Sequence, residues 1–401
     1  MPNPSAPHNG GAAIDGQITI AVAGLGRRIA TVIRHLAAAA PGARLVGYVD
    51  PAPMGLEMLA KRNIGAGVAY GDVSSMLTAT TPDLLMVGSP NHLHLSHIRA
   101  GLEAGVRVFT EKPVVRTEEE TWEMARLLAT HGQDAVLVGL VLRSAPLVRG
   151  VQAVLDAGKL GDLISFEGNE HLHPEHGAFL MRDWRRHQAH GGSFLLDKCC
   201  HDFDLYRLFA GNARPARVTS FGGRAVFTDK NQELEAQRYP GGEEAYRLWP
   251  AGWNATGETF GSDGDVTDHQ TALVAYENGV QLAFHANTHS AIPQRRWYLS
   301  GTRGALEADL ITNRLTFRDA LGAQPPETQI FEGKASEHYG SDPAMGRDLA
   351  AHLLEGAAFP VHVYDALVAG LTVMAIDKAM TTNKVVDCRP LWEKLDGALR
   401  R

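Results

Sequence analysis

The chain has 401 residues, of which 44% are hydrophobic and 21% are charged, and its formal net charge is −7. This length exceeds one ordinary core and predicts two domains. The sequence has no Lys/Arg run and no apolar run of roughly 18 residues, so we expect no binding to nucleic acid and no membrane association. Three cysteines cannot form a disulfide framework, so we expect reduced thiols and a cytoplasmic protein.

The first segments predict a nucleotide site. Residues 1–16 are rich in Pro, Gly, Ala and Asn and lack the basic start and apolar core of a signal peptide, so we interpret them as a disordered tail. Residues 18–23 are a continuous apolar run, typical of a strand buried on both faces. A glycine turn and an alanine-rich helix to Ala40 follow, and then a strand over 44–49 that ends at Asp50.

This order of elements fits a dinucleotide. Gly24 and Gly26 would let the backbone approach a pyrophosphate at the helix N-terminus, and Asp50 would accept a hydrogen bond from a ribose 2′-hydroxyl. Ile29 stands where the usual fingerprint has a third glycine, which predicts slightly wider packing of the helix on the strand. Because the Asp50 carboxylate repels a 2′-phosphate, we expect NAD rather than NADP; the two arginines after Gly26 are the residues that could reverse this preference.

The alternation of strands and helices continues to residue 141. It predicts strands over 84–88, 106–110 and 135–140, and a helix over 117–130 that a capping box of Thr117 and Glu120 opens. Such alternation predicts a doubly wound parallel sheet, and we assign residues 17–141 to a dinucleotide-binding domain.

Polar residues follow the strands of this sheet at the edge where ligands collect. One group is Ser89-Pro90-Asn91-His92-Leu93-His94, and another is Glu111-Lys112-Pro113. The position of Lys112 predicts an ammonium directed at a substrate oxygen or the nicotinamide. His92, His94 and His97 begin a helix beside the cofactor, so we expect caps and contacts there rather than a metal site.

A second, α+β domain is predicted over 142–401. A helix over 146–157 precedes a strand over 163–167, and further strands are predicted over 270–276, 280–286, 296–300 and 305–309, with a hairpin turn at Asn278-Gly279. Asp342 can cap a helix with Pro343 at its first position. We expect a last helix over 365–379, which could pack on the first domain.

Three segments of this domain leave alternatives open. His171, His173 and His176 could bind a metal, which would suit a metal-dependent isomerase or lyase, but Pro174 breaks the segment and a pocket or surface loop is favoured. The run Arg182-Asp183-Trp184-Arg185-Arg186 suits sugar rings and phosphates, or else a solvated loop around a packed tryptophan. The long segment 229–265 predicts a lid, a substrate wall or an oligomer contact.

Residues 191–204, Gly191-Gly192 and the helix after them, carry the proposed acid–base centre. Asp197 and His201 are four residues apart and so project from one helix face. A carboxylate beside an imidazole orients a general base. Such a pair alone is more often structural, and it gains meaning from Lys112 at the nucleotide edge. Cys199 and Cys200 are interpreted as packing residues, and no role is assigned to Lys198.

These motifs together resemble the glucose–fructose oxidoreductase/inositol dehydrogenase/rhizopine-catabolism (Gfo/Idh/MocA) family, over roughly residues 17 to 392. The resemblance rests on the glycine turn, residues 89–94, Glu111-Lys112-Pro113, residues 138–146, 158–162 and 191–204, and the late turn 301–307. It implies a Rossmann domain followed by an open, mainly antiparallel sheet whose outer face makes a homodimer or homotetramer. It also implies an NAD(P)-dependent oxidoreductase for a sugar, sugar derivative or cyclitol, with redox-neutral glycoside hydrolases and non-catalytic sensors as alternatives on the same fold.

The family's catalytic positions fall on Lys112, Asp197 and His201. Predicted cofactor contacts come from Gly24, Leu25, Gly26, Arg27, Arg28, Asp50, Ser89, Pro90, Asn91, His94, Glu111, Lys112, Arg143 and Trp184. Predicted substrate contacts come from Lys112, Arg182, Arg185, Asp197 and His201, and no metal is expected.

Overall fold

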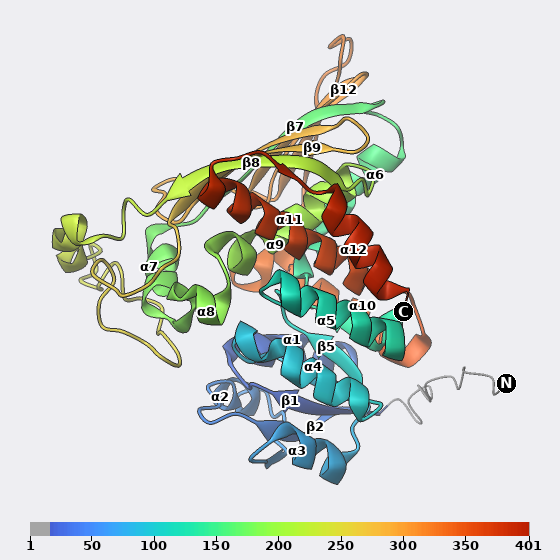
Figure 1. The fold of residues 1–401 in the computed structure, drawn as a ribbon, viewed down its shortest axis with the longest axis vertical. Helices are drawn as coiled ribbons and strands as arrows, with labels where there is room; N and C mark the ends of the chain where they lie inside the picture. Colours follow the sequence, from blue (N-terminus) through green and yellow to red (C-terminus); the bar gives the residue numbers. More distant parts are fainter. Residues whose placement is uncertain (1–16, 401) are drawn as a thin grey trace.

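The computed structural model describes residues 17–400. The predicted tail over 1–16 lies outside the described residues, as does Arg401. Two sheets organise the rest of the chain, sheet A at the bottom and sheet B at the top of Figure 1. Helices α9 (Phe194–Phe209), α11 (Val363–Thr382) and α12 (Arg389–Leu399) lie between them.

Sheet A is the predicted doubly wound parallel sheet. In the described residues it has six strands in the order β3-β2-β1-β4-β5-β6, all parallel. Their bounds are Val68–Ala69 (β3), Ala43–Val49 (β2), Ile18–Ala23 (β1), Leu84–Val87 (β4), Arg107–Thr110 (β5) and Val136–Val138 (β6). The central strands are apolar and buried because helices cover both faces. These helices are α1 (Arg27–Ala39), α2 (Leu56–Ala60), α3 (Val73–Thr80), α4 (His94–Glu103) and α5 (Glu118–His131).

Sheet B is mostly antiparallel, as predicted, with one parallel pair. In the described chain it has nine strands in the order β14-β13-β12-β11-β7-β10-β9-β8-β15, and only β10 and β7 pair in parallel. Their bounds are Glu327–Ile330 (β14), Arg314–Asp319 (β13), Gly304–Asp309 (β12), Arg296–Gly301 (β11), Leu163–His171 (β7), Gln281–Asn287 (β10), His269–Tyr276 (β9), Pro215–Gly223 (β8) and Val386–Asp387 (β15). Alternate residues of β9 and β10 are buried and exposed, so one face packs on helices while the other faces outward.

Several local predictions in this part are wrong. The chain continues past α11 into α12, which packs on α5, so the helix predicted as the last is followed by another. The segment of His171, His173 and His176, predicted as a pocket or surface loop, instead joins the end of β7 to the start of helix α7 (Pro174–Arg182), which has Pro174 as its first residue. Asp342 does not cap α10 (Ser341–Glu355); Gly340 holds the cap position and the Asp342 carboxylate binds Arg28 of α1 instead. Helix α6 (Pro146–Asp156) forms as predicted.

The C-terminal segments return to the first domain. Helix α10 packs along α1, and α12 packs on α5, where the Lys394 ammonium lies 4.5 Å from the centre of the Trp122 ring. Within residues 17–400, no helix has both the length and the hydropathy to span a bilayer. The same residues contain no group of three His, Cys, Asp or Glu side chains placed to hold a metal ion.

Candidate active site

The turn after β1 leaves room for a ligand at the start of α1. Gly24 has φ +84°, and a Cβ there would lie 2.3 Å from the Ser89 backbone nitrogen, so only glycine fits. Gly26 caps α1 without a side-chain hydrogen bond, and a Cβ there would meet nothing within 4 Å. The first N–H groups of α1 therefore face open space, and this cradle suits a pyrophosphate.

Ile29 is accommodated by a second glycine rather than by wider packing alone. Its side chain is fully buried, and a Cβ on Gly88 would lie 2.6 Å from the Ile29 Cβ. Gly88, at the end of β4, thus gives the space that the missing third glycine would have given at position 29. The neighbouring Leu25 packs its side chain into the core, and its carbonyl accepts from the Gly55 N–H at 2.9 Å.

Some of the charged side chains around this turn already have partners in the protein, and others are exposed. The Asp50 carboxylate, at the end of β2, accepts from the Ala52 N–H at 2.7 Å. Arg27 is exposed. Arg28 is held by Glu111 at 2.9 Å and by Asp342 at 2.6 Å. Burial opposes the charge of Arg28, but these two carboxylates outweigh it and raise its pKa. Arg28 and Glu111 were predicted to contact the cofactor, and the structure joins them to each other and to the second domain.

The segment after β4 connects the nucleotide edge to the second domain. Pro90 precedes a short 3-10 turn (Asn91–Leu93), and the buried His94 ring bridges the Ser89 and Pro113 carbonyl oxygens at 2.9 and 2.7 Å. The Asn91 amide donates to the Gly191 carbonyl at 2.8 Å and to Asp197 Oδ1 at 3.1 Å. Asn91, predicted as a cofactor contact, therefore positions the catalytic candidate Asp197.

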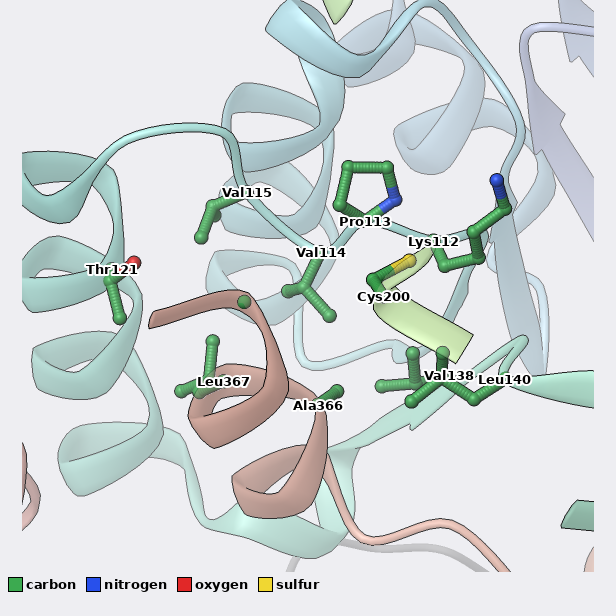
Figure 2. Close-up of a pocket in the computed structure, with 11 residues that line it drawn as sticks. Lys112, Pro113, Val114, Val115, Thr121, Val138, Leu140, Cys200, Ala366 and Leu367 are labelled. Atoms are coloured by element: carbon green, nitrogen blue, oxygen red, sulfur yellow. The ribbon is translucent and has the colours of Figure 1, made fainter. Parts of the chain in front are cut away.

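Lys112 reaches the backbone of Asp197 rather than its carboxylate. The Lys112 Nζ donates to the Asp197 carbonyl oxygen, and the Lys112–Pro113 peptide bond is cis. Figure 2 shows the ammonium directed away from a small apolar pocket that Val114, Leu367 and the Cys200 thiol line. Burial raises the pKa of Cys200 to about 12, which agrees with a packing role.

The electrostatics of Asp197 and His201 differ. Burial alone would raise the pKa of Asp197, but the charges of Lys112 and Arg185 outweigh it and lower that pKa. Arg185 Nε lies 3.4 Å from Asp197 Oδ2. Burial first, and then Lys112, holds the pKa of His201 well below its usual value, so the ring is neutral.

The expected Asp197–His201 hydrogen bond is not formed in the described structure. Asp197 directs its carboxylate to Asn91 and Arg185, and His201 Nδ1 is buried without a hydrogen-bond partner. The prediction that Asp197 fixes the tautomer of His201 through a direct bond is therefore wrong for this arrangement. A buried imidazole nitrogen without a partner can accept a proton from a ligand that enters the site.

Four other predicted site residues have protein partners. Arg185 stacks on the buried Trp184 ring with 4.1 Å from its guanidinium carbon to the ring centre, and binds Asp183 at 2.6 Å. Arg182 donates to the Trp249 carbonyl at 2.7 Å. Arg143 is tied by two bonds to Asp204 and one to Asp365. Of these four, Arg185 alone touches a predicted catalytic residue within the described residues.

A second group of charged residues behind α9 was not predicted. The Arg295 guanidinium binds Asp202 at 2.6 and 2.9 Å and Glu170 at 2.9 Å. Burial raises the pKa of Glu170 to about 7. Lys198, left without a role above, donates to His176 Nε2 at 2.7 Å. These residues come from β7, α7, α9 and the residue before β11, so no spacing along the chain could have predicted that they meet.

The segment 229–265 lies against this site. The Trp249 ring centre is 4.4 Å from that of His176, and Trp253 stacks on His92 at 5.7 Å. Trp253 also lies 5.1 Å from His190 of α8 (Gln188–Gly191). The segment therefore reaches from α7 to the nucleotide edge, and a substrate wall is the prediction that this placement favours.

The fold and site define a class of NAD-binding oxidoreductases with a Rossmann domain and a second, mixed-sheet domain. The family model described as an oxidoreductase family with an NAD-binding Rossmann fold matches residues 18–140, and the model of the GFO/IDH/MocA C-terminal domain matches residues 148–307. The chain belongs to the Gfo/Idh/MocA family.

Relatives and solved structures agree with this placement. The scyllo-inositol 2-dehydrogenase (NAD(+)) of Bacillus subtilis is 26% identical over 263 residues, which cover 62% of this chain and 73% of that protein. A levoglucosan dehydrogenase in complex with NADH and levoglucosan superposes with a TM-score of 0.73 at 18% identity, over 92% of this chain and 99% of that one. The myo-inositol 2-dehydrogenase of Lactobacillus plantarum gives 0.72 at 20% identity, over 92% and 99%.

Proposed function

We propose that this chain transfers a hydride reversibly between a carbinol of a sugar, sugar derivative or cyclitol and NAD. One observation carries the proposal: Lys112, from the nucleotide edge, meets Asp197 one helical turn before the buried, neutral His201. NAD, when bound, supplies the hydride acceptor. His201 then takes the hydroxyl proton as general base. Lys112 offsets the negative charge that develops on the same oxygen.

Asp197 is assigned a role through Lys112 and Arg185 rather than through His201. Its backbone carbonyl accepts from Lys112, its carboxylate lies 3.4 Å from Arg185 Nε, and Asn91 fixes the orientation of that carboxylate, so both cations would lie near the reacting oxygen. The relatives named above act on cyclitols and an anhydrosugar, which supports the substrate class.

NAD is preferred over NADP in this proposal. Asp50 follows β2 at the position that the dinucleotide pattern assigns to the ribose 2′-hydroxyl, where its charge would repel a 2′-phosphate. Arg28 is committed to Glu111 and Asp342. Arg27 is then the remaining nearby cation, and one exposed arginine offsets the Asp50 charge only in part.

We also propose a homodimer or homotetramer through the outer face of sheet B. Leu273 of β9 and Tyr298 of β11 are 59% and 39% exposed and line one groove on that face. Phe221 of β8 is 68% exposed. Exposed large apolar side chains on one face of a sheet are typical of protein interfaces.

The test is a panel of polyols, sugars and glycosides with NAD, followed by absorbance of NADH. The His201→Asn variant should lose about 10²–10⁴-fold in kcat, the usual contribution of a general base, while NAD binding survives. NAD binding is measured by calorimetry. Wild-type turnover that His201→Asn leaves unchanged would contradict the assignment. Cleavage of a glycoside without net NADH would instead support a redox-neutral hydrolase.

A further inference from the structure

Lys198 is an ammonium in the site without an anionic partner. It follows Asp197 directly on α9 and lies three residues before His201, so it shares a side of the helix with the proposed base. Its Nζ donates to His176 Nε2 at 2.7 Å. In the described part of the chain no carboxylate forms an ion pair with it, whereas Arg28, Arg143, Arg185 and Arg295 all have such partners.

The partner of Lys198 is uncharged. His176 is partly buried under the Trp249 ring, and burial together with Lys198 itself holds the pKa of His176 well below its usual value. A neutral imidazole accepts one hydrogen bond and leaves two ammonium protons free. Lys198 and His176 are both partly exposed, so these protons can reach a ligand.

The opposing charge with the largest effect on Lys198 already has another partner. Glu170 has the largest favourable effect on Lys198, but Glu170 is bound to Arg295. Burial also raises the pKa of Glu170, which opposes the charge that this carboxylate could offer Lys198. A partly buried ammonium without an ion-pair partner is stabilised more by an anionic ligand than by a neutral one.

We infer that the substrate carries a carboxylate, as in a hexuronate or an aldonate, and that Lys198 binds it while Lys112 and His201 hold the carbinol that is oxidised. This inference rests on the proposed function. The i,i+3 spacing puts the Cβ atoms of Lys198 and His201 about 5–6 Å apart, so the carboxylate and the carbinol lie within a few bonds of each other. Trp249, beside His176, then borders the carboxylate end of the substrate.

The pH dependence follows from the groups around Lys198. Burial lowers its pKa to about 8, so the ammonium is lost as pH rises above that value and the acidic substrate is held less tightly. The charged and titratable groups that face it are Glu170, His176, Lys112, Arg295, Asp197 and His338. Arginine at position 198 would stay charged and would move this alkaline limit upward.

The experiment compares matched pairs with the NAD-loaded enzyme: glucuronate with glucose, and gluconate with glucitol. The measured quantity is the ratio of kcat/KM for the acid to kcat/KM for its neutral partner. Wild type should favour the acids, and Lys198→Met should lower the ratio by about 10–100-fold, chiefly through KM, as expected for a charged hydrogen bond. Lys198→Arg should restore the ratio and raise the alkaline limit. Lys159→Met serves as the matched control and should leave the ratio unchanged, because Lys159 lies in the turn after α6 and pairs with Glu327.

Two results would overturn the inference: a wild-type preference for the neutral partners, or an equal ratio in wild type and Lys198→Met. If wild type oxidises none of the four compounds, the proposed function fails by this panel, and calorimetric binding of gluconate to the NAD-loaded proteins still decides the role of Lys198. Binding that Lys198→Met abolishes would support the carboxylate site, and absent or unchanged binding would refute it.

Discussion

Arg143 was predicted to contact the cofactor, and its geometry supports a different role that a single substitution can test. Its guanidinium makes two bonds to Asp204, at 2.7 and 2.6 Å, and one to Asp365 at 3.0 Å. The side chains of Arg143 and Asp204 are 8% and 1% exposed. Asp365 keeps a second partner in Arg207 when Arg143 is removed, but Asp204 loses its ion pair.

The Arg143→Met variant therefore leaves one buried carboxylate without its cation. Breaking a buried pair in this way costs about 3–5 kcal/mol. For a domain of about 250 residues, a loss of about 3 kcal/mol in the free energy of unfolding corresponds to a fall of roughly 6–12 °C in Tm. Affinity for NAD should stay within a factor of about 3, because in this structure the guanidinium is committed to α9 and α11 and not to the nucleotide edge.

Scanning calorimetry measures the change in Tm, and titration calorimetry measures NAD binding. Arg149→Met is the matched control, because Arg149 is 54% exposed and its pair with Asp348 should contribute less than about 1 kcal/mol. Burial raises the pKa of Asp204, and removal of Arg143 raises it further, so the loss of stability should shrink as pH falls and the carboxyl becomes protonated. An unchanged Tm with NAD affinity lowered tenfold or more would refute this reasoning and restore Arg143 to the cofactor site.

Three further outcomes test the nucleotide edge and the core. Gly24→Ala should abolish measurable NAD binding, because its Cβ would lie 2.3 Å from the Ser89 nitrogen at φ +84°; unaltered binding by calorimetry would contradict that close approach. Asp50→Ala should lower the NAD/NADP ratio of kcat/KM by about tenfold, and an unaltered ratio would remove its proposed role. Burial raises the pKa of Asp377 to about 6, above the usual value near 4, so its ionisation costs stability as pH rises through that window. In scanning fluorimetry, the Tm of Asp377→Asn relative to that of wild type should rise between pH 4 and pH 7. A difference in Tm between the two proteins that does not change with pH would count against the raised pKa of Asp377.

The sequence was sufficient for five of the six strands that sheet A has in the described residues, because their signals are local; the two-residue edge strand β3 was not predicted. Continuous apolar runs mark the buried strands β1, β4 and β5, and the capping box at Thr117 opens α5 as predicted. The turn at Asn278-Gly279 also forms, with Gly279 at φ +89°. These features depend on neighbours within a few residues, and such interactions can be read from one stretch of chain.

The partners of the site residues could not be predicted in the same way. Helix α9 is buried on nearly all sides, although Asp197, Asp202 and Asp204 lie within it. Each buried carboxylate needs a donor, and the donors are far away in the sequence: Asn91 for Asp197, Arg295 for Asp202 and Arg143 for Asp204. The helix periodicity shows which side chains share a face, but which segment of the fold meets that face depends on the tertiary arrangement.

The same reasoning explains why Asp197 and His201 do not bond to each other. The Asp197 carboxylate has two donors other than the His201 ring, namely the Asn91 amide and the Arg185 guanidinium. A hydrogen bond from a charged guanidinium is stronger than one from a neutral imidazole, so the carboxylate turns toward these donors. His201 then keeps an unpaired ring nitrogen within the protein. An unpaired nitrogen costs stability in a buried site, and its retention beside Lys112 and Lys198 is consistent with a substrate that completes all three. In that arrangement the hydroxyl satisfies His201 and Lys112, and the carboxylate satisfies Lys198, so a carboxylate-bearing substrate leaves fewer polar groups of the site unpaired than a neutral sugar does.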